Sequence, residues 1–594
     1  MCGIAGIMTT TGGAPDAAAL DALAEALAHR GPDGTGRYRA GSVAMVQTRL
    51  AIIDLVSGDQ PIVEPGGAAL VANAEIYDYI EQREALRGVR FATNSDCEVP
   101  LHLYRRDGVR FAESLRGMYA IAIHDPAAER LVLARDPFGI KPLYYTLTGD
   151  ALAFASEPQA LFAAGLATPR LDSKARNQLL QLQFVAGRKT VFEGVQRVLP
   201  GETLVVVRGR IVERFRRPAL PAGGPAAWSE AEARDKLAEA FVDSVGLHQR
   251  SDVPYGMFLS GGIDSTLLLA VMARLNDQPV HAFTVGFPNS RARDERAHAR
   301  RIARRLGAEH VEVAFTEADF WAHLPAVAAA MDDPAADYAT VPTYLLARTA
   351  AQGLKVVLTG EGGDEIFAGY GRYRSTLRPW WRGGKAFRGR GVFDRLAILR
   401  AEPTGWRDGI RAAEATEGGG GRSRLQAAQA VDIADWLPND LLLKLDRCLM
   451  AHGLEGRTPI LDPAVAAVGF ALPDGLKVHD RLGKWLLRRW LAELVPEAEP
   501  FARKRGFSVP VGEWIAAHGA RLGPLLAAQP GIQELCRPGR VEALCRDCRG
   551  RHTGFAAWLL LFYALWHRRH VLGLAPAGDA FDSLAASATA MRTG

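Results

Sequence analysis

The chain has 594 residues, a length that favours two or more domains over a single core. Its 71 basic and 66 acidic residues leave a formal net charge of +5, which is small for this length and indicates neither a nucleic-acid partner nor a membrane partner. Six cysteines do not make a disulfide framework, and the N-terminus lacks the basic flank and apolar core of a signal peptide, so we expect a reducing cytoplasm.

The first feature along the chain is a cysteine in second place, in Met1-Cys2-Gly3. Removal of the initiator methionine would leave Cys2 with a free α-amino group beside its thiol. That amine has a reference pKa of about 7.7–8.0, against about 8.5 for the thiol, so it can take the thiol proton. Cys2 is therefore a candidate nucleophile for an amide carbonyl, and a cysteine placed there by chance is the alternative.

A nucleophile that acts on a primary amide needs an oxyanion hole, which an Asn side chain and a neighbouring backbone N–H can form. Asn73 and Ala74, in the stretch from Val71 to Tyr77, have these groups. If the amide is glutamine, the site also needs an Arg for its carboxylate and an acid for its ammonium. Arg49 and Asp96 are of the right types.

These ordered motifs resemble class II glutamine amidotransferases over roughly residues 2–200. The resemblance implies an αββα N-terminal-nucleophile sandwich (α+β) in which Cys2 hydrolyses glutamine and Asn73 and Ala74 form the oxyanion hole. The family usually has glycine at the place of Ala74, but alanine retains the backbone N–H that is needed there. The implied glutamine-binding residues are Arg49, Ile53, Asn73, Ala74, Glu75 and Asp96.

Composition then marks the domain boundaries. Alternating apolar runs such as Met118 to Ile123 predict strands of the sandwich. A Pro-, Ala- and Gly-rich stretch predicts a linker over 217–229. We therefore expect a glutaminase domain over 1–216, a second domain over 230–572 and a flexible tail over 573–594.

A glycine loop, Ser260 to Ser265, follows the apolar run that ends at Leu259 and leads into a predicted helix. Glycines let the backbone approach an anion, and the helix start offers free N–H groups, so the loop can cradle phosphate. Asp264 would repel phosphate unless a divalent cation lies between them, which indicates a magnesium nucleotide. An ordinary strand-to-helix turn is the alternative.

A second loop of the same kind, Thr359 to Phe367, follows the buried-type strand Leu354 to Leu358. Two such loops predict an open parallel α/β sheet that binds its ligand at the carboxyl ends of its strands. The alternative is that Glu361, Asp364 and Glu365 only solvate a turn. The motif G-x-x-x-x-G-K-[ST] is absent, so an ordinary P-loop enzyme is excluded.

The first loop, Ser260 to Ser265, resembles the pyrophosphate loop of the ATP-pyrophosphatase superfamily (adenine nucleotide alpha-hydrolase-like), and residues 360–365 resemble the signature of the asparagine synthetase family. Further matching stretches are 443–447, 454–462, 483–484 and 503–508. The implied catalytic residue of the acyl-adenylate step is Glu361, and the implied Mg²⁺ ligands are Asp264 and Asp364. The implied ATP and pyrophosphate contacts are Leu259, Ser260, Gly261, Gly262, Asp264, Ser265, Val285, Thr359, Gly360 and Lys504.

The resemblance implies an ATP-dependent ligase that makes asparagine from aspartate, with ammonia drawn from glutamine, and small molecules as its partners. It is compatible with a homodimer. Two alternatives stay open: the same chemistry on another carboxylate, such as a peptide or an envelope-sugar precursor, and a non-catalytic scaffold that inherited the fold.

Two features near the C-terminus need separate interpretation. Cys536, Cys545, Cys548 and His552 have the residue types of a zinc site, but their spacing is unusual, and packing or chance is the alternative. The apolar run from Phe555 to Trp566 is shorter than the about 20 residues that a bilayer requires, so we expect a buried helix there.

Overall fold

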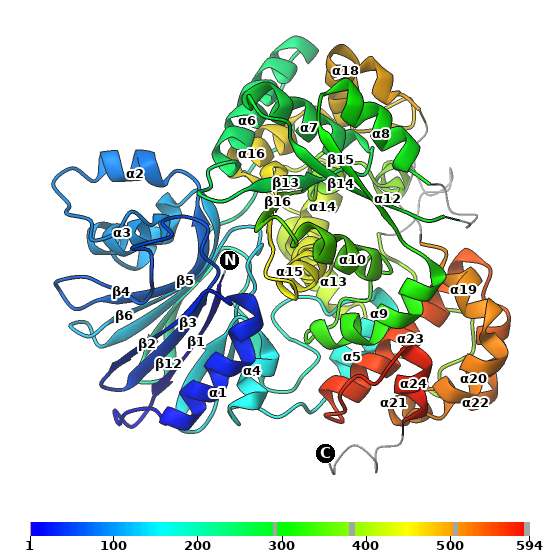
Figure 1. Ribbon diagram of the computed structural model, residues 1–594, viewed down its shortest axis with the longest axis horizontal. Helices are drawn as coiled ribbons and strands as arrows, with labels where there is room; N and C mark the ends of the chain where they lie inside the picture. The colour runs from blue at the N-terminus through cyan, green and yellow to red at the C-terminus, as the bar shows by residue number, and fades with distance from the viewer. Residues whose placement is uncertain (1, 289–293, 379–386, 503–508, 587–594) are drawn as a thin grey trace.

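Two antiparallel sheets face each other in the N-terminal part of the chain, at the left in Figure 1. The computed structural model describes residues 2–288, 294–378, 387–502 and 509–586. The first sheet has the order β10-β8-β9-β1-β3-β2, and the second has the order β12-β11-β7-β6-β5-β4. The strands are β1 Gly3–Thr9, β2 Gly34–Ala40, β3 Val43–Arg49, β4 Ile62–Val63, β5 Ala69–Ile76, β6 Gly117–Asp125, β7 Arg130–Arg135, β8 Tyr144–Leu147, β9 Ala151–Ala155, β10 Val195–Arg197, β11 Glu202–Val207 and β12 Arg210–Arg216.

Alternation along the strands builds the layers of this sandwich. Ile4 and Met8 of β1 join the core between the two sheets, whereas Ala5 and Ile7 face the helical layer. That layer consists of α1 Ala17–Leu27, α4 Pro158–Ala163 and α5 Ser173–Leu182. The outer face of the other sheet carries α2 Tyr79–Ala85 and α3 Val99–Asp107. The expected αββα sandwich is confirmed.

The second domain is built on a five-stranded sheet of order β15-β14-β13-β16-β17, in which every pairing is parallel. Its strands are β13 Tyr255–Phe258, β14 His281–Gly286, β15 Glu309–Ala314, β16 Val356–Leu358 and β17 Glu455–Arg457. Val356 and Leu358 pack into one core and Val357 into the other, so both faces are covered. The expected parallel α/β sheet is confirmed.

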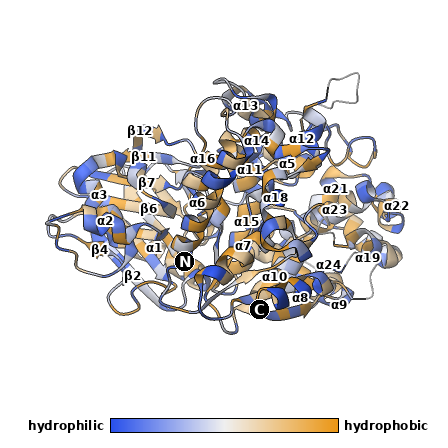
Figure 2. Cartoon of the chain, turned by 90° about the horizontal axis from the view of Figure 1, so that it is seen from above, coloured by the Kyte–Doolittle hydropathy of each residue, from blue (hydrophilic) through white to orange (hydrophobic). Residues whose placement is uncertain are grey.

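Helices cover the two faces of this sheet. One face carries α6 Glu230–His248, α7 Ile263–Leu275, α8 Arg296–Arg305, α16 Pro463–Ala471 and α18 Trp485–Leu494. The other carries α9 Glu317–Ala330, α10 Thr340–Ala350 and α15 Leu442–Met450. Hydrophobic residues, orange in Figure 2, lie along α7 and α16, which supply much of the first of these cores. The smaller elements are α11 Gly363–Ile366, α12 Gly371–Thr376, α13 Asp408–Glu417, α14 Arg424–Val431, α17 Asp474–Lys477, β18 Val478–His479, β19 Leu482–Gly483 and a π-helical stretch, Asp432–Leu441.

The segment that joins the two domains has neither helix nor strand. The last strand of the sandwich ends at Arg216, and α6 begins at Glu230 after a capping box formed by Ser229 and Glu232. We therefore keep the proposed domain boundary within 217–229.

The C-terminal part is a helical layer of α19 Val511–Ala517, α20 Gly519–Ala527, α21 Pro530–Leu535, α22 Pro538–Arg546, α23 Arg551–His570 and α24 Ala580–Ala585. The apolar run from Phe555 to Trp566 lies in α23, which is buried along most of its length, as expected. The expected tail needs correction. Phe581 of α24 is buried, with its ring centroid 4.6 Å from that of Trp321, so apolar contacts hold the chain to the domain as far as α24.

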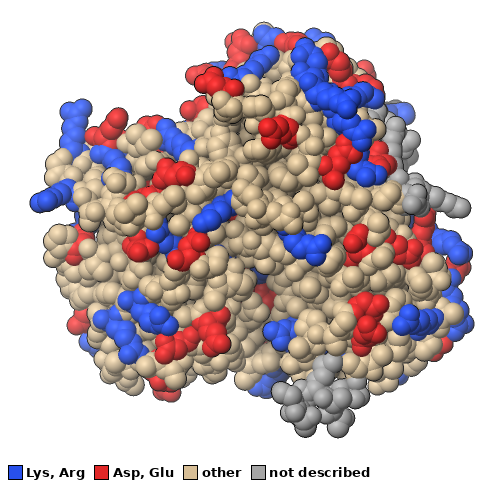
Figure 3. Space-filling model, viewed as in Figure 1, with Lys and Arg blue, Asp and Glu red and all other residues tan. Residues whose placement is uncertain are grey.

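Charges of both signs are mixed over the surface that Figure 3 shows. The arginines of α8 fit this pattern, because Arg300 pairs with Glu312 and Arg305 with Glu497. Among the described residues, no helix is both long and apolar enough to cross a membrane.

Candidate active sites

Cys2 lies directly before β1 and beside β5, where the sandwich meets the second domain (Figure 1). Its backbone N–H donates to Oδ1 of Asn73 at 3.0 Å, and the residue is 7% exposed. Burial raises the pKa of the Cys2 thiol, so the thiol needs a base to become a nucleophile. Nδ2 of Asn73 is buried and has no hydrogen-bond partner among the described residues, which suits a donor kept for an oxyanion.

Arg49 is brought close to Cys2 by the antiparallel register of β1 and β3. Its Nη1 atom lies 2.7 Å from Oδ1 of Asp59, and Nη2 donates to the carbonyl oxygen of Ile53 at 3.5 Å. Asp59 is exposed, so a substrate carboxylate could replace it on the guanidinium without leaving a buried charge unpaired.

The other residues predicted to bind glutamine lie along β5 and next to it. Asp96 is buried and accepts a hydrogen bond from the backbone N–H of Ile76 at 2.7 Å. Ala74 lies inside β5, whose extended backbone any L-residue can adopt, so alanine is accommodated in place of the usual glycine. The structure therefore places Asn73 and Arg49 beside Cys2 and joins Asp96 to β5, the strand that carries Asn73.

Glu75 has a partner that no local motif indicates. Its Oε2 atom lies 2.9 Å from Nη2 of Arg457, which is fully buried on β17 of the second domain. Arg457 also donates from Nε to Glu455 at 2.6 Å. Glu75, which the resemblance predicts to bind glutamine, thus takes part in the domain interface.

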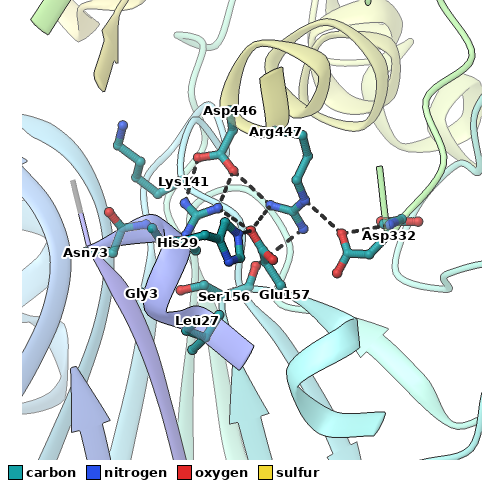
Figure 4. Close-up of polar contacts among 12 residues, drawn as sticks. Gly3, Leu27, His29, Asn73, Lys141, Ser156, Glu157, Asp332, Asp446 and Arg447 are labelled. Carbon is teal, nitrogen blue, oxygen red and sulfur yellow. Dashed lines mark hydrogen bonds and ion pairs between the residues drawn. The ribbon is translucent and has the colours of Figure 1, made fainter. Parts of the chain in front are cut away.

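A buried ion network joins the two domains next to Cys2 (Figure 4). Arg30 donates from Nε to the carbonyl oxygen of Cys2 at 3.3 Å and from Nη1 to Glu157 at 2.6 Å. Its two Nη atoms also reach both carboxylate oxygens of Asp446, at 2.8 and 2.9 Å. Arg447 closes the network from α15, at 2.8 Å from Asp446. Asp446 lies in the stretch 443–447 that resembles the family, but Arg30 is 416 residues away, so nothing local reveals their pairing.

A cavity of about 770 Å³ opens at the carboxyl ends of β13 and β16, between the two glycine loops. Its walls contain the predicted nucleotide residues Leu259, Ser260, Gly261, Gly262, Asp264, Ser265, Val285, Thr359, Gly360, Glu361 and Asp364. The size lies in the range of small-molecule sites. Lys504, also predicted to contact the phosphates, lies outside the described residues.

Backbone conformation and close packing explain why glycines occupy the two loops. Gly261 and Gly362 have φ angles of 67° and 89°, which favour glycine. A Cβ atom on Gly363 would lie 2.5 Å from Cγ of Asp264. The second loop therefore rests directly against the carboxylate of the first.

Asp264 and Asp364 converge on one cation, the ammonium of Lys484. The Nζ atom lies 2.8 Å from Oδ1 of Asp364 and also contacts Oδ2 of Asp264. Burial lowers the pKa of Lys484, but the two carboxylates outweigh burial and raise the pKa above its ordinary value. Two carboxylates that meet at one point on the cavity wall fit a Mg²⁺ ion carried in with phosphate oxygens. The sequence motif contains Lys484 but does not indicate this pairing.

Glu361 lies at another part of the cavity, with two residues that the sequence did not assign to the site. Its Oε1 atom is 3.8 Å from Nζ of Lys444, which lies 3.0 Å from Oδ2 of Asp337. Burial raises the pKa of Glu361, and the charge of Lys444 opposes that rise. Lys444 falls within a stretch that resembles the family, and only the tertiary structure brings it to Glu361.

In the described part of the chain, the candidate zinc ligands near the C-terminus are not gathered into a group that could hold a metal ion. Cys536, Cys545 and Cys548 are buried, and the Sγ atom of Cys548 donates to the carbonyl oxygen of Gly512 at 3.3 Å. Among the described residues, no group of three or more His, Cys, Asp or Glu is placed to hold a metal ion. Burial raises the pKa of the Cys545 thiol to about 12, which favours the neutral packing form.

Comparison with known proteins places both halves of the chain in described families. Residues 1–215 match the family model described as a glutamine amidotransferase domain. Residues 236–568 match the model described as asparagine synthase. Together the two matches cover both predicted sites.

Curated relatives match along nearly the whole chain. A putative glutamine-hydrolysing asparagine synthetase of Mycobacterium tuberculosis strain H37Rv is 33% identical and covers 96% of this chain and 97% of its own. Asparagine synthetase [glutamine-hydrolyzing] 1 of Bacillus subtilis is 34% identical and covers 96% of each chain. Amidase chyE of Penicillium rubens is also 34% identical, over 60% of this chain and 56% of its own.

Proposed function

Because this chain belongs to the asparagine synthase family of ATP-dependent ligases and carries a glutamine amidotransferase domain, we propose that it is a glutamine-dependent asparagine synthetase. Cys2 releases ammonia from glutamine, and ATP adenylates the side-chain carboxylate of aspartate. Ammonia then attacks the acyl carbon and gives asparagine, AMP and pyrophosphate. The observation that carries this proposal is a nucleotide-sized cavity whose carboxylates converge on one cation, in the same chain as a buried Cys2–Asn73 pair.

The glutaminase chemistry follows from the groups around Cys2. With Met1 removed, the α-amine takes the thiol proton, and the thiolate attacks the amide carbon of glutamine. Nδ2 of Asn73 donates to the oxyanion that forms, while Oδ1 holds the Cys2 nitrogen at 3.0 Å. The C–N bond breaks, ammonia leaves with the proton, and water hydrolyses the thioester to glutamate and free Cys2.

The synthetase chemistry takes place in the cavity. An oxygen of the acceptor carboxylate attacks the α-phosphorus of ATP, and the bond to pyrophosphate breaks. Lys484, whose ammonium lies between Asp264 and Asp364, neutralises negative charge on the leaving pyrophosphate. Asp264 and Asp364 would hold Mg²⁺, which supplies further neutralisation of the phosphate oxygens when bound. Ammonia then bonds to the acyl carbon, AMP leaves, and the attacking nitrogen loses its extra proton.

A second candidate keeps this machinery and changes the acceptor to a peptide or an envelope-sugar precursor. It is prompted by a relative with a different name, Amidase chyE, which is 34% identical over 60% of this chain, whereas Asparagine synthetase [glutamine-hydrolyzing] 1 of Bacillus subtilis is 34% identical over 96% of it.

The deciding experiment measures pyrophosphate release by the purified enzyme with glutamine, magnesium ATP and a panel of carboxylates. We expect aspartate to elicit stoichiometric pyrophosphate, AMP and asparagine. Pyrophosphate release with another acid and none with aspartate would establish the second candidate. Release with no acid, while glutamate still forms, would refute both.

A further inference from the structure

The ammonium of Lys444 lies between the carboxylates of Asp337 and Glu361 in the cavity wall. The side chain of Lys444 is only 6% exposed, and its Nζ atom lies 3.0 Å from Oδ2 of Asp337 and 3.8 Å from Oε1 of Glu361. All three residues line the cavity. Lys444 is distinct from Lys484, which pairs with Asp264 and Asp364 at the two glycine loops.

The reaction creates an electrostatic problem at this place. An acceptor carboxylate must approach an anionic α-phosphate in a cavity already lined by Asp337 and Glu361. In a partly desolvated site, such repulsion is much stronger than in water. A buried cation held within the cavity wall opposes it without needing to move during the reaction.

Lys444 is the cation that opposes the rise in the pKa of Glu361. Burial raises the pKa of Glu361, and Asp337, Asp364 and Asp264 raise it further, whereas Lys444 lowers it. Lys444 in turn faces Asp337, Glu361 and Asp440, whose carboxylates keep its ammonium charged against burial. Without the lysine, nearby charge would favour a protonated Glu361.

The position of Lys444 is fixed by its own helix. Asp446 of α15 accepts two hydrogen bonds from Arg30, and the neighbouring Arg447 donates from Nε to Asp332 at 2.8 Å. These buried contacts anchor the turn that carries Lys444, so its ammonium is held at a set distance from Glu361.

We propose that Lys444 is a positioning residue for the acyl-adenylate step, which holds the carboxylate of Glu361 in place and admits the acceptor carboxylate to the α-phosphate. The inference rests on the proposed function, because it assigns Lys444 to the same reaction. A purely structural role, in which the pair with Asp337 only anchors the start of α10, is the competing explanation.

The experiment compares Lys444→Met, Lys444→Arg and Asp337→Asn with Lys355→Met, whose exposed lysine pairs with Asp33 away from the cavity. Acceptor-dependent exchange of pyrophosphate into ATP, ammonia-dependent synthesis against pH, glutamate formation and thermal unfolding are measured for each. We expect Lys444→Met to lose about 10²-fold or more in exchange. We also expect the acid limb of its pH–rate profile to move to higher pH, because Glu361 would keep its proton longer.

Lys444→Arg should recover part of the exchange rate and the position of the acid limb, because it restores a cation. Asp337→Asn should perturb exchange less than Lys444→Met, and Lys355→Met should match the wild type. An unmoved acid limb with normal exchange in Lys444→Met would overturn the proposal. Parallel loss of exchange, glutamate formation and thermal stability would overturn it in favour of the structural role. A wild-type enzyme that exchanges with no carboxylate would instead refute the proposed function.

Discussion

Arg457 of β17 pairs with Glu75 of β5 across the domain boundary, with 2.9 Å between Nη2 and Oε2. Glu75 follows the oxyanion candidates Asn73 and Ala74 along the same strand. The carbonyl oxygen of Arg457 accepts from the backbone N–H of Thr359 at 2.8 Å, at the start of the second glycine loop. One buried residue therefore contacts the strand of the glutaminase site through its side chain and the loop of the synthetase site through its backbone.

Removing Arg457 should weaken both the fold and the transfer of nitrogen between the sites. Arg457→Met removes the guanidinium that the buried carboxylates of Glu75 and Glu455 share, a change that costs about 3–5 kcal/mol. We expect a lower urea midpoint and a larger loss in glutamine-dependent than in ammonia-dependent synthesis. Arg457→Met combined with Glu75→Gln should regain part of the stability, and no regain would show that the pair is not the source of the effect.

Cys2→Ala should abolish glutamine-dependent synthesis and leave ammonia-dependent synthesis at the wild-type level. The thiol is the proposed nucleophile only for glutamine, so we expect a loss of about 10³-fold or more in glutamate formation. Cys545→Ala, which changes another buried cysteine in the C-terminal helices, is the matched control and should keep both activities. Loss of both activities in a folded Cys2→Ala protein would contradict two separate sites.

Asp264→Asn should remove synthesis while sparing basal glutamine hydrolysis. The carboxylate contacts Lys484 and is a proposed Mg²⁺ ligand, so the amide weakens charge neutralisation at the phosphates. When the residual pyrophosphate release is titrated with Mg²⁺, the half-maximal rate should require a higher Mg²⁺ concentration than in the wild type. Unimpaired synthesis in this variant would refute the magnesium role.

Gly363→Ala should lower pyrophosphate release through sterics alone. Its new Cβ atom would lie 2.5 Å from Cγ of Asp264 and would push that carboxylate away from Lys484. Gly353→Ala is the matched control, because a Cβ there meets nothing within 4 Å. Equal rates in the two variants would show that the close contact of the loops is not needed.

Stability should fall in mild acid because of His248. Burial lowers the pKa of this imidazole to about 3, while its ring lies 3.8 Å from that of Tyr77, between centroids, across the domain boundary. The unfolded chain takes up this proton near pH 6.5 and the native protein does not, so stability is complete above about pH 6.5 and declines below it. At pH 5 the loss from this group is about 2 kcal/mol. Urea midpoints at pH 7.5 and 5 should differ less in His248→Gln than in the wild type, and equal differences would refute this assignment.

The sequence by itself determined the local chemistry of this protein. Glycines and a carboxylate after an apolar strand are enough to predict a loop such as Ser260 to Ser265, because short-range sterics and hydrogen bonding decide such turns. Period-two alternation likewise predicted the strands of the sandwich, and resemblance to two families supplied the expected roles of Cys2 and Glu361.

Only the tertiary structure decided which charges meet. Arg30 finds Asp446 at a separation of 416 residues, Glu75 finds Arg457, and Lys444 finds Glu361. Each of these residues alone is compatible with a solvated surface. Burial makes a charge costly unless a partner arrives from another element, and the packing of the two domains supplies those partners. The pairing of the sites is therefore a property of the folded interface, because no local pattern encodes contacts between segments so far apart.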